Sequence, residues 1–266
     1  MNRRELLRTT TALGVGGALA ATTSTTANAA APTPTAAVTP TAAATSGAAA
    51  PKPSERPLRV HLVMYDGVED LDFAAPYEVL SAAGYFSPRP VEVRYVSATG
   101  ARSVTAAFGT RVHGIKPWAP EDADLLVVPG GGYARRDRPG VWAEIDRGIL
   151  PRALADAVRP GLTVSALCTG VILVAAAGLT KGRPCTTHHK AKDELERRGG
   201  LLKNARVVDD GDLVTAGGVT SGLELSLWLA RRELGPDTAL GLEEMLEYEA
   251  RGTVWTSDRT PVRPRS

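Results

Sequence analysis

The residue of this sequence best suited to chemistry is Cys168. It stands between a short, apolar, β-favouring run at 163–167 and an Ala- and Leu-rich run that ends at Gly178. A strand is therefore predicted to lead directly into a helix, with the small residues Ala166 and Gly170 on either side of the cysteine. This spacing is typical of a nucleophile elbow, because only small neighbours let the backbones pass in so sharp a turn. The start of the helix should also favour the thiolate, which is the nucleophilic form.

A buried structural thiol is the simpler interpretation of Cys168, since free cysteine is among the most buried residue types. The second cysteine, Cys185, lies in an extended segment beside Pro184 and away from any helix start, and is predicted to be structural. Two cysteines in an exported chain would by default suggest a disulfide. We do not expect one, because a domain of this size can fold without a bridge.

Five carboxylates cluster after the first predicted strand: Asp66, Glu69, Asp70, Asp72 and Glu78. Most of them are expected to be solvated or to cap the helix that follows. Asp72 differs from the others because apolar residues flank it on both sides. A carboxyl group held in a partly apolar pocket beside a thiol would have a raised pKa and could transfer protons.

Gly130-Gly131-Gly132 follows another predicted strand. No Lys-Ser/Thr pair comes next, and the spacing fails the dinucleotide-binding pattern, so neither kind of phosphate loop is predicted. A glycine pair can bring backbone N–H groups close to a developing anion, although a tight turn is the alternative.

His188-His189 could suggest a metal, but adjacent residues on a strand point to opposite faces. We therefore expect no metal.

The elements that must position these residues alternate between strands and helices. Strands are predicted at 58–65, 91–96, 124–129, 163–167 and 184–188, with hairpins at 104–112 and 205–216. Helices are predicted at 71–83, closed by Gly84, and at 141–158, 169–178, 191–198, 221–234 and 238–250. Such alternation predicts an α/β fold, a three-layer sandwich with a mainly parallel sheet. Ligands bind at the carboxyl ends of its strands, where the carboxylate cluster, the glycine run and Cys168 all fall.

The N-terminus has the features of an export signal. Arg3-Arg4 precedes a weakly apolar run at 12–21 and a small-x-small cleavage pattern at 27–29. Residues 1–29 are therefore predicted to be a twin-arginine signal peptide that directs the protein to the extracellular or cell-wall space. An Ala/Thr/Pro-rich disordered linker is predicted at 30–57, one domain at 58–252 and a flexible tail at 253–266.

The charge of the chain is nearly balanced, with 31 basic and 29 acidic residues and a formal net charge of +2. This balance does not suggest a nucleic-acid or anionic-membrane partner. The N-terminal apolar run is too short and too poor in Leu and Ile to span a bilayer, so no stable membrane association is expected.

Four stretches of sequence stand in an order that resembles the ThiJ/PfpI superfamily. They are LDFAAPYEV at 71–79, VPGG at 128–131, SALCTG at 165–170, and AGL with TTH between 177 and 188. The resemblance covers nearly all of 58–250 and implies a flavodoxin-like, class I glutamine-amidotransferase-like fold. It is greatest to the isonitrile hydratase branch and to the ligand domains of some AraC-type regulators.

The resemblance implies roles for particular residues. Cys168 would be the nucleophile and Asp72 its acid/base partner, while the backbone N–H groups of Gly131 and Thr169 would stabilise an anion. Three further residues would support the pocket: Gly130, Gly170 and His188. The family also implies a homodimer that acts on a small-molecule substrate without a cofactor.

Two positions distinguish the branches of this superfamily. Glu would stand at position 72 in the deglycase-like branch, and the proteases carry His directly after the nucleophile, whereas this chain has Asp72 and Thr169. Both differences favour the isonitrile hydratase branch, although Ala75 stands where that branch often has Gly. Branch members are typically intracellular, in contrast to the export signal predicted here.

The function implied is the conversion of an isonitrile to an N-substituted formamide through a thioimidate on Cys168. Amide hydrolysis or removal of carbonyl adducts is an enzymatic alternative. A ligand-binding or redox-sensing module that uses Cys168 is an alternative of another class. No helix-turn-helix pattern follows Ala250, so a DNA-binding regulator is not expected.

Overall fold

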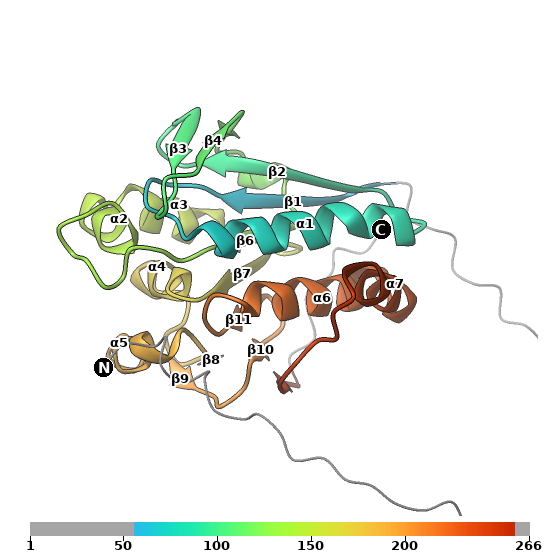
Figure 1. The fold of residues 1–266 in the computed structure, drawn as a ribbon. Helices are drawn as coiled ribbons and strands as arrows, with labels where there is room; N and C mark the ends of the chain where they lie inside the picture. Colours follow the sequence, from blue (N-terminus) through green and yellow to red (C-terminus); the bar gives the residue numbers. More distant parts are fainter. Residues whose placement is uncertain (1–55, 259–266) are drawn as a thin grey trace, which may run out of the picture. The chain divides into compact units, whose positions relative to one another are not determined.

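A single large sheet organises residues 56–258, the part of the chain that this computed structural model describes (Figure 1). Its eight strands lie in the order β12-β10-β11-β7-β6-β1-β2-β5. They are β1 (Leu58–Val63), β2 (Val91–Ser97), β5 (Lys116–Pro117), β6 (Leu125–Val128), β7 (Thr163–Leu167), β10 (Val207–Asp209), β11 (Leu213–Ala216) and β12 (Val254–Thr256). All neighbouring strands are parallel except β10 and β11, which form the predicted antiparallel hairpin.

Two small sheets lie beside the main one. The first is the predicted hairpin of β3 (Ser103–Thr105) and β4 (Arg111–His113), and the second pairs β8 (Pro184–Cys185) with β9 (Leu201–Leu202) in parallel. The four central strands β1, β6, β7 and β11 are almost entirely buried. Helices cover both of their faces, which is why even polar side chains on these strands, such as His61 and Ser165, are buried.

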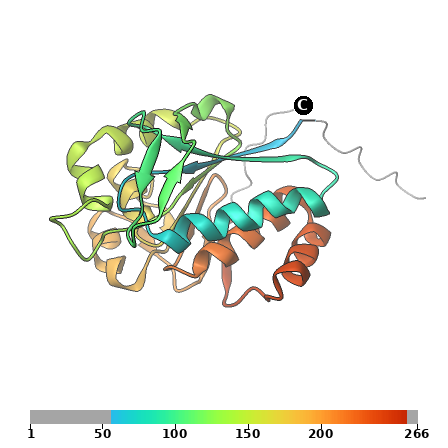
Figure 2. The ribbon, with the colours of Figure 1, turned by 45° about the horizontal axis from the view of Figure 1, so that its top comes forward.

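Seven α-helices complete the described fold. They are α1 (Asp70–Phe86), α2 (Val141–Arg147), α3 (Ile149–Ala157), α4 (Gly170–Ala176), α5 (Lys192–Arg197), α6 (Ser221–Leu234) and α7 (Pro236–Leu246). One layer consists of α1, α6 and α7, which share a small apolar cluster, and α2, α3 and α4 pack together on the other side of the sheet (Figure 2). The predicted three-layer α/β sandwich with a mainly parallel sheet is confirmed.

The structure corrects several predicted boundaries. The helix predicted at 141–158 is two helices, because Gly148 adopts a left-handed φ of 70° and ends α2 where α3 begins. Gly84 lies inside α1 and does not close it. The predicted strand at 184–188 is reduced to β8, and the last helix ends at Leu246. Residues 254–256, which were predicted to belong to a flexible tail, form β12 against β10.

Several predictions concern residues outside 56–258. The signal peptide at 1–29, nearly all of the linker at 30–57, and residues 259–266 are not described. Within the described part of the chain, no helix combines the length and the apolar character needed to cross a membrane.

Candidate active site

Cys168 occupies the sharp turn between β7 and α4. Its φ is 52°, a left-handed value that is uncommon for a residue with a side chain. Its backbone N–H donates to the carbonyl of Gly217 over 2.7 Å, which ties the turn to the end of β11. A Cβ atom at Gly170 would come within 2.3 Å of the Val128 carbonyl, so the start of α4 approaches the end of β6 closely. The predicted nucleophile elbow is therefore present, and its small neighbour is sterically required.

Asp72 lies in the first turn of α1 and is fully buried. Its Oδ2 accepts a 2.9 Å hydrogen bond from the Gly130 N–H, and no donor within the described residues meets hydrogen-bond geometry at Oδ1. Burial raises the pKa of Asp72 to about 7, against the opposing effects of the Gly130 N–H and the Cys168 thiol. The raised pKa that the flanking apolar residues predicted is thus found beside Cys168.

The thiol of Cys168 is 5% exposed, and its pKa is raised to about 12. Burial is the main cause and the negative charge of Asp72 the second, while the backbone N–H groups of Val219 and Thr169 lower the pKa. The start of α4 does favour the thiolate, as expected, through the Thr169 N–H, but desolvation outweighs this effect and leaves the pKa raised. At neutral pH Cys168 keeps its proton, and attack by the sulfur needs a base.

Gly131 and Thr169 face each other across the elbow. The Gly131 N–H donates to Thr169 Oγ1 over 3.0 Å, and the Thr169 N–H interacts with the Cys168 sulfur. A Cβ atom at Gly130 would lie 2.5 Å from Thr169 Oγ1, so this strand end also requires glycine. Of the two predicted N–H groups, that of Thr169 contacts the Cys168 sulfur, whereas that of Gly131 is bonded to the Thr169 hydroxyl and would have to give up this bond in order to bind an anion.

Three residues to which the sequence analysis assigned no role complete the surroundings of Cys168. Val219, with a left-handed φ of 34°, presents its backbone N–H to the sulfur. Thr187 donates from Oγ1 to the Cys168 carbonyl over 2.7 Å. The buried Tyr65 donates to the Pro129 carbonyl over 2.8 Å, and burial together with Asp72 raises its pKa.

A signal for Val219 does exist in the sequence. Gly217-Gly218 follows β11 much as Gly130-Gly131 follows β6, and both pairs come at the carboxyl ends of the two parallel strands that flank β7. The second pair could have been recognised by this position alone.

Two carboxylates of the acidic cluster anchor the β3–β4 hairpin and do not serve as helix caps. Asp66 Oδ1 accepts from the Thr105 N–H over 2.8 Å, and Asp70 Oδ2 accepts from the Phe108 N–H over 2.9 Å. Glu69 occupies the N-cap position of α1 without a side-chain capping bond. The hairpin is therefore fixed to the connection that carries Asp72.

His188 lies next to the elbow but outside any strand, at the start of a short 3₁₀ helix (His189–Ala191). Its Nδ1 accepts from the Lys190 N–H over 3.2 Å. The ring centroids of His188 and His189 are 4.2 Å apart, so the prediction that the two side chains point to opposite faces is wrong. The prediction assumed strand geometry, whereas a turn places adjacent rings together. Within residues 56–258, no group of three His, Cys, Asp or Glu side chains is placed to hold a metal ion.

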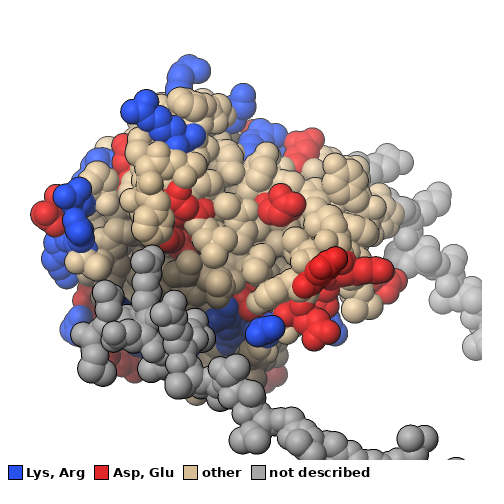
Figure 3. Space-filling model, in the orientation of Figure 1, with Lys and Arg blue, Asp and Glu red and all other residues tan. Residues whose placement is uncertain are grey.

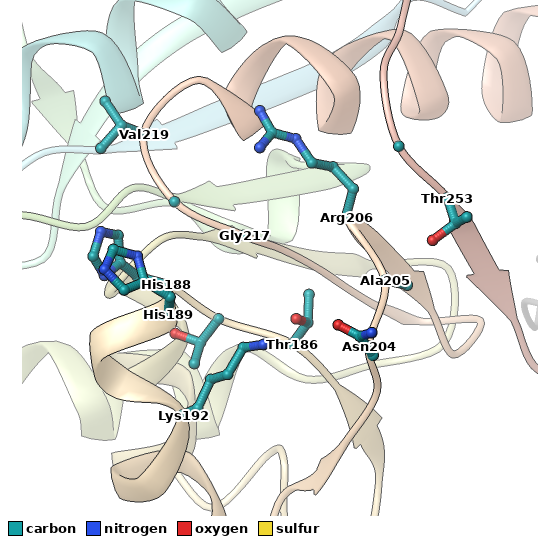
Figure 4. A pocket seen from close by; sticks show the side chains of 13 residues that line it. Thr186, His188, His189, Lys192, Asn204, Ala205, Arg206, Gly217, Val219 and Thr253 are labelled. Atoms are coloured by element: carbon teal, nitrogen blue, oxygen red, sulfur yellow. The ribbon is translucent and has the colours of Figure 1, made fainter.

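A cleft of about 630 Å³ adjoins this site (Figure 4). Thr187, Gly217 and Val219 line it, and each of these residues also contacts Cys168 through a hydrogen bond. The same residues therefore form part of the wall of the cleft and part of the surroundings of Cys168.

Comparison with known proteins identifies related sequences. The sequence model of the DJ-1/PfpI family matches residues 58–232. An isonitrile hydratase of Pseudomonas putida is 32% identical over 195 residues, which is 72% of this chain and 78% of that protein. The HTH-type transcriptional regulator GbdR of Pseudomonas aeruginosa is 26% identical over 220 residues, which is 80% of this chain but 57% of the regulator.

Solved structures show the same fold. A ThiJ/PfpI family protein from Pseudomonas syringae matches with a TM-score of 0.64 and 24% identity, over 79% of this chain and 83% of that chain. DJ-1beta of Drosophila melanogaster matches with a TM-score of 0.63 and 20% identity, over 73% of this chain and 99% of that chain. At these identities the structures establish the fold alone.

Proposed function

The chain belongs to the DJ-1/PfpI family, and on this basis we propose that it is a cysteine-dependent isonitrile hydratase that forms an N-substituted formamide. The observation that carries the proposal is the buried pair of Cys168 and Asp72. With pKa values of about 12 and about 7, the pair holds one proton above neutral pH, and that proton resides on sulfur. A thiol beside a carboxylate base is the arrangement that nucleophilic catalysis requires.

The pair can supply both of the proton transfers that forming the thioimidate needs. Asp72 removes the Cys168 proton as the sulfur attacks the terminal carbon of the isonitrile and the S–C bond forms. Asp72 then delivers this proton to the same carbon, which gives a thioimidate. The first step leaves the carboxyl group of Asp72 protonated, and the second step uses that protonated form as the acid. Acid–base catalysis by a single group requires this order.

Hydrolysis of the thioimidate completes the reaction. Water adds to the carbon, the S–C bond breaks and the formamide leaves. One proton of the water ends on the amide nitrogen and the other on the sulfur, so the site returns to its starting state. In this step the backbone N–H groups of Thr169 and Val219 are placed to stabilise charge on the departing sulfur.

Formamide formation from an isonitrile, measured with three proteins, tests the proposal. Wild type should turn over, and Cys168→Ala should be inactive and gain no mass on exposure to the isonitrile. Asp72→Asn should stay folded but lose at least about a hundredfold in turnover, because general acid–base assistance contributes roughly 10²–10⁴ in rate. Turnover within a few-fold of wild type in either variant would exclude the mechanism.

The pH dependence of kcat/KM gives a second test. Asp72 acts as a base only when it is ionised, and its pKa is about 7. The rate should therefore fall as the pH drops below about 7, with one proton taken up. The residual rate of Asp72→Asn should lack this acid limb. A wild-type rate that stays flat between pH 5 and pH 8 would argue against Asp72.

A ligand-binding module is the second candidate, favoured by the similarity to GbdR over 80% of this chain. Redox sensing by Cys168 is less well supported, because oxidation requires thiolate character and burial raises the pKa of this thiol. Stoichiometric binding of isonitriles without turnover would favour the module.

The homodimer implied by the family resemblance remains a prediction, for which sedimentation analysis is the test.

A further inference from the structure

The cleft beside Cys168 carries positive side chains and no negative ones. Lys192 and Arg206 are the positive residues that line it, His188 and His189 lie beside them, and none of its thirteen lining residues is Asp or Glu (Figure 4). Thr187 contacts the Cys168 carbonyl and Val219 contacts the Cys168 sulfur, and both residues belong to the wall of the cleft, so the cleft lies directly beside Cys168.

Lys192 supplies the unbalanced charge. It is half-buried at the start of α5, and within the described residues no hydrogen bond or ion pair links its ammonium group to a carboxylate. Figure 4 shows its side chain reaching across the cleft toward Thr186. An ammonium group that is partly removed from water and lacks a counter-ion attracts an anion more strongly than one on an open surface.

Arg206 contributes differently, because its charge is already compensated. Its Nη2 donates to Glu224 Oε2 over 3.1 Å and to Thr220 Oγ1 over 2.7 Å, which fixes the guanidinium group against the start of α6. Its buried Nε–H has no hydrogen-bond partner within the described residues. Arg206 is therefore a rigid wall residue whose charge is largely compensated by Glu224 and whose buried Nε–H is not accessible from the cleft.

His188 adds a second donor to the cleft. Because its Nδ1 accepts a hydrogen bond from the Lys190 N–H, the neutral ring carries its proton on Nε2. The ring lies directly on Gly218, where a Cβ atom would come within 2.2 Å of Cδ2. The ring is thus held in place beside the loop that supplies Val219.

Lack of acidic side chains is not a general property of this surface. A second hollow, on the outer side of α7, is lined by Glu243, Glu244, Glu247 and Glu249, and acidic side chains gather there in Figure 3. The contrast between the two hollows shows that the sign of charge differs locally and that the positive one is the one beside the nucleophile.

We propose that the cleft is a subsite for an anionic group of the substrate, with Lys192 as its principal ligand and a carboxylate-bearing isonitrile as the substrate class. The proposal rests on the proposed isonitrile hydration and specifies its substrate. One cation supported by neutral donors suits a singly charged carboxylate. The same positive cleft would also draw such substrates toward Cys168.

Kinetics with a matched pair of substrates test the subsite. Isocyanoacetate and its methyl ester share the reacting carbon and differ in charge. Wild type should favour the carboxylate by about fivefold in kcat/KM, in keeping with a partly exposed ion pair. Lys192→Gln should abolish this preference and Lys192→Arg should keep most of it. Lys181→Gln, the same charge change at an exposed site outside the cleft, should show the wild-type preference.

Binding measured without catalysis separates the subsite from the reaction. Cys168→Ala should bind N-formylglycine about fivefold more tightly than its methyl ester, and adding Lys192→Gln should remove the difference. Equal affinities, or no measurable binding of N-formylglycine, would overturn the subsite. Turnover of both isonitriles without a charge preference would also overturn it and leave the hydratase intact. Selective binding of N-formylglycine without any isonitrile turnover would support the subsite and exclude the hydratase.

Discussion

At the scale of single residues, the site depends on a proton shared unequally by Cys168 and Asp72. Burial raises the pKa of both groups, so the thiol stays protonated while the carboxyl titrates near neutrality. In the proposed mechanism Cys168 is therefore activated during attack and is not held as a thiolate beforehand. The buried carboxylate has a cost for the fold, because ionising it without a full set of donors is unfavourable.

This cost predicts how Asp72→Asn changes stability with pH. Burial raises the pKa of Asp72 to about 7 in the folded protein, against the ordinary aspartate value of 3.8, so the folded state holds this proton more tightly than the unfolded chain. Ionisation of Asp72 therefore lowers the free energy of unfolding of wild type as the pH rises from about 4 to about 7. The stability of Asp72→Asn relative to wild type should rise by up to about 4 kcal/mol across this window.

Chemical denaturation of both proteins near pH 4 and at pH 8 measures this difference. The comparison near pH 4 is the internal control. It measures any change in the free energy of unfolding that replacing the carboxyl by an amide causes independently of pH. A stability difference that is the same at both pH values would show that Asp72 titrates normally in the folded protein.

Cys185 provides a prediction at the same scale. It is fully buried, burial raises its pKa to about 11, and both cysteines are present as free thiols. Cys185→Ala should lose some stability through the removed sulfur but keep turnover within a few-fold of wild type. Thermal denaturation and turnover, measured beside Cys168→Ala, check this. If a folded Cys185→Ala protein were as inactive as Cys168→Ala, Cys185 would take part in the reaction.

At the scale of elements, the site depends on how closely α4 approaches the end of β6. Gly170 allows this approach, since a side chain there would lie 2.3 Å from the Val128 carbonyl and 2.5 Å from the Pro129 carbonyl. Neither backbone atom can move alone, because β6 lies in the centre of the sheet between β1 and β7.

Gly170→Ala should therefore destabilise the protein by at least 1–3 kcal/mol, the usual range for overpacking, and displace the elbow. Gly84→Ala is the matched control. Its Cβ atom would meet nothing closer than 3.9 Å inside α1, and alanine should stabilise the helix by up to about 1 kcal/mol. Melting temperatures should move in opposite directions. Equal melting temperatures for Gly170→Ala and wild type would mean that the elbow tolerates a side chain.

At the scale of the whole molecule, the described fold follows an N-terminal region that carries the predicted export signal. Arg3-Arg4 and the cleavage pattern at 27–29 motivate this prediction. Arg3→Lys together with Arg4→Lys should keep the protein inside the cell, as fractionation and detection of the unprocessed chain would show. A chain that still carries both arginines is the control. Normal export of the double variant would exclude the twin-arginine route.

The sequence by itself determined the main elements and pointed to Cys168 and Asp72, the two residues that we propose to react. Predicted strands that alternate with predicted helices along the chain indicated a parallel sheet between helices. Parallel strands place their carboxyl ends at one edge of the sheet. Small residues around Cys168 predicted the elbow, and the apolar neighbours of Asp72 predicted its raised pKa. These inferences succeed because each depends on local spacing or on a rule of sheet topology.

Only the tertiary structure decided what depends on contacts between distant segments. The thiol is protonated because burial outweighs the start of α4, and burial is a property of the whole packed site. Val219, Thr187 and Lys192 reach the neighbourhood of Cys168 from connections that follow β11, β8 and the 3₁₀ helix. β12 forms because β10 offers an unpaired edge to a β-favouring run that is too short to indicate a strand by itself. Desolvation, edge pairing and the charge of a cleft arise from residues far apart in the chain, and local sequence patterns do not contain them.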